Sequence, residues 1–233
     1  VFGGLVEAAS GAVLILWLFA IVALKAKVIR RFGVLADDMK VLPGRAGLAA
    51  STMTGMAVAA VLVPYAPKVA LVLALASLLA HGIMAVVLVA TLARMPPEAR
   101  GVNPAMHLAF VGFILAAIPL AQLGWAMTAT VIFWITLAVA VLIWGMSIVQ
   151  LIRQVPPAPL RPMLAIHLAP AALLSLVAAG IGLPMLAQGF AVLGMVILLA
   201  LMSSAKWLVA TGFSPLWGSF TFPLSAFATA LMS

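Results

Sequence analysis

The 233-residue chain contains no cysteine and very few charged residues. Without cysteine it can form no disulfide bond and no thiolate metal site. Only 7% of its residues are Asp, Glu, Lys or Arg, whereas about a quarter are charged in soluble globular proteins. This composition excludes a water-soluble fold. The 67% share of hydrophobic residues indicates instead a protein that lies within a membrane.

Acidic residues are especially scarce, with four in the whole chain. Asp37, Asp38 and Glu98 fall between apolar stretches, and Glu7 lies near the end of one. No pair of carboxylates lies at membrane depth, which weakens a proton- or sodium-coupled carrier mechanism. The sequence also has no nucleophile–base pair, phosphate-binding P-loop or zinc motif. We therefore expect neither an enzyme nor a cofactor or metal site.

Apolar stretches of about 20 residues recur along the chain, and each could cross a hydrocarbon core roughly 30 Å thick. We expect eight transmembrane helices, separated by Pro- and Gly-rich turns. Their ranges are 5–28, 46–64, 68–93, 104–122, 125–151, 162–179, 184–208 and 215–233. No connection is long enough to fold separately. The sequence thus predicts one domain, 1–233, in an all-α polytopic membrane protein.

The basic residues are sorted between the two sides of this predicted bundle. Eleven of the twelve Lys and Arg residues flank the first, third, fifth and seventh connections, and Lys68 alone lies on the other side. By the positive-inside rule, these four connections are cytoplasmic, so the net charge of +8 reflects topology rather than nucleic-acid binding. Val1 and Ser233 would then lie outside. We expect a fragment, with one further span at each end of the native protein.

Proline spacing indicates an internal repeat of helical hairpins. In each unit a first proline is followed eight residues later by a second proline or a small residue. The four pairs are Pro43/Ser51, Pro104/Gly112, Pro162/Pro170 and Pro215/Pro223. The units start 61, 58 and 53 residues apart, the length of two spans with their turns, as in stacked or ring-like repeats. Inside a helix the second proline should cause a kink, because it removes a backbone donor.

The two helices of each unit differ in side-chain size. The first is rich in small residues, which let helices approach closely, and the second is bulky, as suits a helix that faces lipid. We therefore expect an inner ring of helices around a central pore, within an outer ring. Seven residues after each first proline come the four residues that would face the pore axis at one depth: Ala50, Val111, Ala169 and Phe222. Phe222 would plug the pore. The alternative is that Phe222, one of eleven phenylalanines, is a packing residue.

Three segments resemble those of a known family. Pro-Leu-Trp-Gly-Ser-Phe-Thr-Phe-Pro at 215–223 resembles the ninth-helix motif of the bacterial tellurite-resistance/C4-dicarboxylate transporter (TehA) family, which includes the plant guard-cell slow anion channels. The segments 161–171 and 103–109 resemble its seventh and fifth helices. In order and spacing, the likeness covers the whole chain as helices two to nine of ten.

The resemblance implies a homotrimer in the bacterial inner membrane, with five hairpins in each protomer around a pore that a phenylalanine closes. That residue would be Phe222, with Pro223, Pro170 and Gly112 at the helix breaks. It implies a channel for small anions such as nitrate and chloride in a lipid bilayer. The pore would favour weakly hydrated anions, because no Lys or Arg lies at membrane depth. The first alternative is a secondary transporter that exports tellurite or C4-dicarboxylates.

Three histidines fall within or near the spans, and buried histidine pairs can ligate haem. His107 and His167 alone lie at matched depth, each about one turn inside the basic end of its helix, whereas His81 lies in the middle of a span. We expect a hydrogen-bonded structural role for the pair. A haem-carrying redox subunit remains the alternative from another class of protein.

Overall fold

The computed structural model describes residues 3–233, apart from the side chains at positions 3, 6, 98 and 99. Val1 and the Glu98 side chain therefore lie outside the described part. Over the described residues the chain forms helices and turns without any strand. The all-α class predicted from composition is confirmed.

Each of the eight predicted spans coincides with a helical segment. In chain order the elements are α1 (Gly3–Arg30), α2 (Val34–Lys40), α3 (Leu42–Leu62), α4 (Pro67–Ala93), η1 (Pro97–Arg100), η2 (His107–Val111), α5 (Ile114–Gln122), α6 (Ala126–Arg153), η3 (Ala158–His167), α7 (Leu168–Gly180), α8 (Pro184–Ser203), α9 (Ala205–Leu208), η4 (Pro215–Trp217) and α10 (Gly218–Leu231). Within the described part of the chain, six segments are long and apolar enough to cross a membrane, and 107–122 is a shorter apolar helix. The α3 helix begins four residues earlier than predicted, because Pro43 is accommodated in its first turn.

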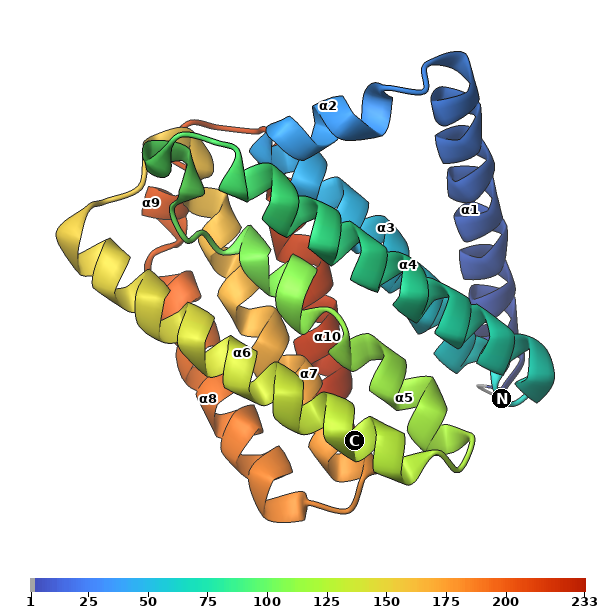
Figure 1. Cartoon of the computed structure of the whole chain (residues 1–233). Helices are drawn as coiled ribbons and strands as arrows, with labels where there is room; N and C mark the ends of the chain where they lie inside the picture. The colour runs from blue at the N-terminus through green and yellow to red at the C-terminus, as the bar shows by residue number, and fades with distance from the viewer. Residues whose placement is uncertain (1–2) are drawn as a thin grey trace.

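The helices pair as hairpins, and the hairpins pack side by side (Figure 1). The α3, α5 and α7 helices pack on α4, α6 and α8, and the inner helices contact one another in the order α3, α5, α7, α10. Ten of the thirteen α7 residues are buried, whereas Gly194 is the one buried residue of α8. The small-residue helices are thus inside the bundle and the bulky ones outside.

Two hairpin turns share one geometry, as a structural repeat requires. Gly124 after α5 and Gly182 after α7 have φ angles of 84° and 79°, a left-handed conformation that glycine adopts without a steric penalty. In both turns the residue after the glycine donates its N–H to a carbonyl five residues back, at 2.8 Å, which closes the end of the helix. The predicted turns at these glycines are therefore present.

Three of the four inner segments contain irregular helix. Residues 107–111 form a π-helix, 158–167 a 3-10 helix and 215–217 a short 3-10 turn, while α3 is regular. Pro223 lies inside α10, and Pro170 is the third residue of α7, directly after the 3-10 segment. Ser214 precedes the last segment with extended backbone, but its hydroxyl makes no cap hydrogen bond.

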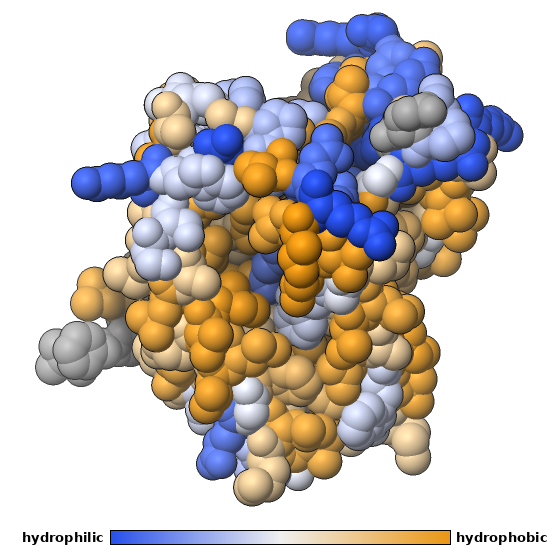
Figure 2. Space-filling model, turned by 90° about the vertical axis from the view of Figure 1, so that its left-hand side faces the viewer, coloured by the Kyte–Doolittle hydropathy of each residue, from blue (hydrophilic) through white to orange (hydrophobic). Residues whose placement is uncertain are grey.

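Charged residues gather at one end of the molecule, above a broad apolar surface (Figure 2). The α2 helix lies at this end, and its carboxylates pair with basic side chains: Lys27 bonds Asp38 at 2.7 Å, and Asp37 bonds both Arg31 and Lys40. The hydrogen bond and charge of Lys40, together with Arg31, lower the pKa of Asp37. This helix was not predicted, since its residues resemble a solvated loop. The α1 helix stands apart from the bundle (Figure 1), and the described side chains of its apolar stretch are all accessible.

Candidate pore

A large cavity lies between the inner helices, with a volume of about 520 Å³. It extends from the first turns of α3 and η4 toward the middle of the bundle, and its wall is mostly apolar. Its lining comprises Pro43, Ala46, Gly47, Ala50, Met53, Thr54, Ala57, Leu108, Leu115, Met163, Ile166, Pro215, Leu216, Gly218, Ser219, Phe222 and Pro223. Four inner segments that are far apart in the sequence thus enclose one space.

Beside this cavity, and also lined by Phe222, lies a much smaller one of about 10 Å³. That volume is about the least that can hold a single water molecule. Its lining comprises Met53, His107, Leu108, Val111, Gly112, Ala169, Pro170, Leu173 and Phe222. Phe222, Met53 and Leu108 line both spaces.

Phe222 belongs to both cavities and is partly buried. Its ring also packs against the main hydrophobic core, while the next residue, Pro223, is buried. The structure brings Phe222 together with Val111 and Ala169, which the repeat places at the same position. Each of these two side chains is almost fully buried, at 1% and 3% exposure.

The inner helix α3 contributes a different residue from the one predicted at this depth. Ala50 lines the large cavity and is exposed, whereas Met53, one turn further along, lines both cavities. From the 107–111 segment, His107 and Leu108 also line the small cavity. The repeat register did not indicate these three residues.

Gly112 allows three helices to meet at the small cavity. A Cβ atom there would lie 2.2 Å from the carbonyl oxygen of Leu108, 2.8 Å from Met53 Sδ and 3.0 Å from His81 Cε1. These distances are below normal contact, so a side chain at Gly112 would force the Leu108 carbonyl and the Met53 and His81 side chains to shift. His81 behind it is fully buried, with its Nδ1 2.7 Å from Thr52 Oγ1 and its ring 4.5 Å from that of Phe113.

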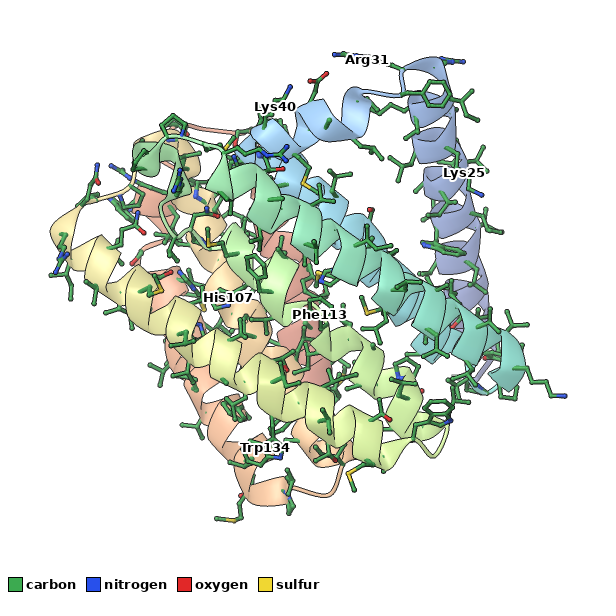
Figure 3. The ribbon with its side chains drawn as sticks, viewed as in Figure 1. Lys25, Arg31, Lys40, His107, Phe113 and Trp134 are labelled. Atoms are coloured by element: carbon green, nitrogen blue, oxygen red, sulfur yellow. The ribbon has the colours of Figure 1, made fainter. Side chains whose placement is uncertain are left out.

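His107 and His167 are in direct contact, as their matched depth predicted. Nε2 of His107 lies 3.0 Å from Nδ1 of His167, and Trp144 Nε1 donates to the carbonyl oxygen of His167 at 3.2 Å. His107 lies within the bundle, in contrast to Arg31 and Lys40 at the charged end (Figure 3). The two facing nitrogens bond each other, so they do not form an open pair of ligands for haem iron. No cluster of three potential metal ligands occurs among the described residues.

Several basic side chains at the charged end donate hydrogen bonds to carbonyl oxygens at the ends of helices. Arg100 Nε and Nη2 donate to the carbonyl oxygens of Met95 and Ala93, just past and at the end of α4. Arg45 donates in the same way to Met39 and Lys40 at the end of α2. Cations near helix C-termini are favourable because the last carbonyls carry partial negative charge. The charged end of the molecule is therefore basic, and hydrogen bonds join its arginines to the ends of the helices.

The sequence profile of the voltage-dependent anion channel family matches residues 7–233. The chain belongs to this family. The match covers nearly every described residue and agrees with the motifs in 103–109, 161–171 and 215–223. A comparison with curated proteins gives no match. Family membership identifies a multi-pass membrane protein with an anion channel or transporter function, and its members are not enzymes.

Proposed function

We propose that this member of the voltage-dependent anion channel family is a channel for small monovalent anions, and that Phe222 closes its pore. The large cavity would be the entrance from the basic side, and the small cavity would be the closed part of the path. The anion would pass between helices whose broken hydrogen-bond patterns leave backbone groups free to face it.

The observation that carries this proposal is the change in free space at Phe222, from about 520 Å³ to about 10 Å³. Val111, Gly112 and Ala169, which line the small cavity together with Phe222, would be too small to close the path by themselves. Removal of the ring would therefore join the two spaces. The half-buried position of Phe222 fits a side chain that borders a cavity on one face and the core on the other.

Phe222→Ala is the direct test. We expect normal yield of folded protein and a large rise in nitrate current after reconstitution into bilayers, because the change removes a ring that faces free space. Phe220→Ala is the matched control, since Phe220 lies on the same helix and lines neither cavity. If Phe222 is instead a packing residue, the change costs about 3–5 kcal/mol, and yield falls without any rise in current per folded protein.

Ion preference separates this proposal from a carrier for C4-dicarboxylates or tellurite. No Lys or Arg lines either cavity, so the path offers little to offset the loss of an ion's hydration. We expect nitrate to be more permeant than chloride, and malate to be poorly permeant. Reversal potentials measured in the three anions test this order. A malate permeability above that of nitrate would favour the carrier.

The assembly and location that the family resemblance implies also belong to this proposal, namely a homotrimer in a bacterial inner membrane. Support comes from the exposed apolar faces of the outer helices, which need lipid or a neighbouring protomer. On α4 and α8 these faces include Val72, Leu79, Val86, Val196 and Leu199, each more than half exposed. The mass of the purified protein in native membrane nanodiscs measures the oligomeric state.

A further inference from the structure

One ring of the histidine pair borders the constriction. His107 is 2% exposed and lines the small cavity beside Phe222 and Gly112. Its Nε2 bonds Nδ1 of His167, with the two rings nearly perpendicular at 84°. Imidazole is the side chain that most readily exchanges a proton under physiological conditions. A proton on this pair would place a charge next to the narrowest part of the proposed pore.

The other ring borders a separate cavity of about 180 Å³, whose wall is mostly apolar but includes several polar side chains. His167 lines it, and so do four further polar residues: Asn103, Ser147, Gln150 and Gln154. This cavity lies where α6 ends and η3 begins, at the charged end of the molecule, and it is large enough for several water molecules. The histidine pair therefore lies between this cavity and the small cavity at Phe222.

Two polar atoms along this connection have no hydrogen-bond partner. Nδ1 of His107 and Oγ of Ser147 are buried and unpartnered. In the neutral pair a single proton lies between the rings, so His107 Nδ1 is either an unused lone pair or an N–H without an acceptor. Buried polar groups normally have partners, and an orphan of this kind calls for an explanation. A small anion admitted beside His107 when the Phe222 ring moves aside would be an acceptor for an N–H at this position.

The surroundings supply no fixed charge that could serve either partner. The segments 46–67, 69–93, 102–152, 162–205 and 207–233 contain no Asp, Glu, Lys or Arg, and they cover the helices packed around the pair except for Lys206 of α9, which packs on η3. The basic residues nearest along the chain are Arg100, Arg153 and Arg161, at the charged end. Arg161 donates to the carbonyl oxygen of Pro156 and stacks over the Trp207 ring. The remaining histidine, His81, lies behind Gly112 and bonds Thr52.

We propose that His107 and His167 form a proton-dependent anion site. The neutral pair takes up one proton by way of the cavity beside His167, and a small anion accepts a hydrogen bond from His107 Nδ1–H. Proton and anion enter together, so the net charge of the site does not change. A lone cation is costly in an apolar site, and so is a lone anion, but the pair is compensated. This inference rests on the proposed passage of anions at Phe222.

Linkage makes the consequence measurable. If the anion binds only the protonated pair, each tenfold rise in proton concentration raises the apparent anion affinity by about tenfold while the pair is mostly neutral. By the same reciprocity, the anion must promote proton uptake. The two effects can be measured separately, one by spectroscopy and one by flux.

The chain has three histidines, so each imidazole can be followed in protein labelled with ¹⁵N-histidine in lipid bilayers. On addition of nitrate at about pH 6, within the range in which histidine titrates, we expect the His107 and His167 signals to move toward imidazolium. His81 should not move. If saturating nitrate leaves both rings neutral down to about pH 5, the inference is wrong. This measurement detects binding whether or not the protein conducts.

Flux measurements complete the test. In proteoliposomes we expect nitrate flux through the wild type to rise as pH falls at the charged end, with a flat pH profile in His107→Gln and His167→Gln. His81→Gln is the control and should keep the wild-type profile. Acid activation that persists in both pair variants would overturn the inference. Absence of flux in the wild type and in Phe222→Ala, with nitrate-dependent proton uptake intact, would instead contradict the channel proposal. If the variants do not fold, the wild-type titration alone decides.

Discussion

The two helices of one hairpin, α7 and α8, have opposite environments although both are apolar and free of charge. In α7 ten of thirteen residues are buried, and in α8 one of twenty. The α7 sequence contains five alanines in thirteen residues, while α8 is rich in Leu, Met and Val. The turn at Gly182 joins them, so chain position does not explain the contrast.

The difference shows that side-chain size, rather than hydropathy, separates inside from outside in this protein. Lipid is as apolar as leucine, so the hydrophobic effect gives no preference for the bundle interior. Small side chains stabilise the interior because they allow backbones to approach closely, and bulky side chains cost little stability when they face lipid. The same contrast holds between α3 and α4, where Gly55 leaves room for the Ser77 side chain. The comparison can be tested where inner and outer helices touch.

The largest effect is expected at Phe227, where α10 meets α8. This ring is 2% exposed and belongs to the main core. Phe227→Ala should lower the free energy of unfolding by about 3–5 kcal/mol, because it leaves a cavity that the helices cannot fill. Leu199 on α8 is 57% exposed, so Leu199→Ala should change the free energy of unfolding by less than about 0.5 kcal/mol. Unfolding in mixed detergent, followed by circular dichroism, measures both. Similar losses would mean that α8 does not face lipid.

Two glycines of α8 give a sharper comparison within one helix. A Cβ atom at Gly194 would lie 2.4 Å from the Phe227 ring, whereas one at Gly189 meets nothing within 4 Å. We expect Gly194→Ala to destabilise by about 1–3 kcal/mol through overpacking. Gly189→Ala should stabilise by about 0.5–1 kcal/mol, because alanine loses less backbone entropy than glycine in a helix. The same unfolding assay applies, and a stabilising Gly194→Ala would refute the close contact.

Much of this fold was predictable from the sequence because the bilayer simplifies the problem. A stretch of about 20 apolar residues has few alternatives to a spanning helix, and Gly124 and Gly182 mark turns by their conformational freedom. The α2 helix was not predictable. It is short, and its two buried residues, Val34 and Met39, are visible as a buried face only once the bundle is present.

At the candidate pore, the spacing from the prolines identified the helices that line the cavity, but not the depth of every residue along them. Counting from the first proline assumes the same rise per residue in each unit. A 3-10 helix rises about 2.0 Å per residue and an α-helix 1.5 Å, so Ala169 lies roughly 13 Å beyond Pro162, but Ala50 only about 10 Å beyond Pro43. Met53, at about 15 Å, comes nearer to the depth of Ala169. The irregular helix types have no clear residue signature, so this offset appears only in the structure.

The smallest effect is expected where a polar contact, rather than packing, joins an inner helix to its outer partner. Thr52 on α3 lies 2.7 Å from Nδ1 of the fully buried His81 on α4. Thr54, two residues on, is exposed and bonds only the carbonyl oxygen of Ala50 in its own helix. Thr52→Val keeps the side-chain shape and removes the hydroxyl, so His81 loses its partner. Hydrogen bonds between membrane helices contribute about 0.6 kcal/mol on average, and at most about 1.7 kcal/mol.

We therefore expect Thr52→Val to lower the free energy of unfolding by an amount in that range, and Thr54→Val to leave it nearly unchanged. The two variants separate the hydrogen bond to His81 from the general effect of a threonine-to-valine change in a helix, because each hydroxyl also donates to a carbonyl oxygen of its own helix. Unfolding of the two variants in one detergent series measures the difference. Equal stabilities would mean that close packing alone holds α3 and α4 together. Side-chain size would then decide the position of polar residues in this bundle as well as that of apolar ones.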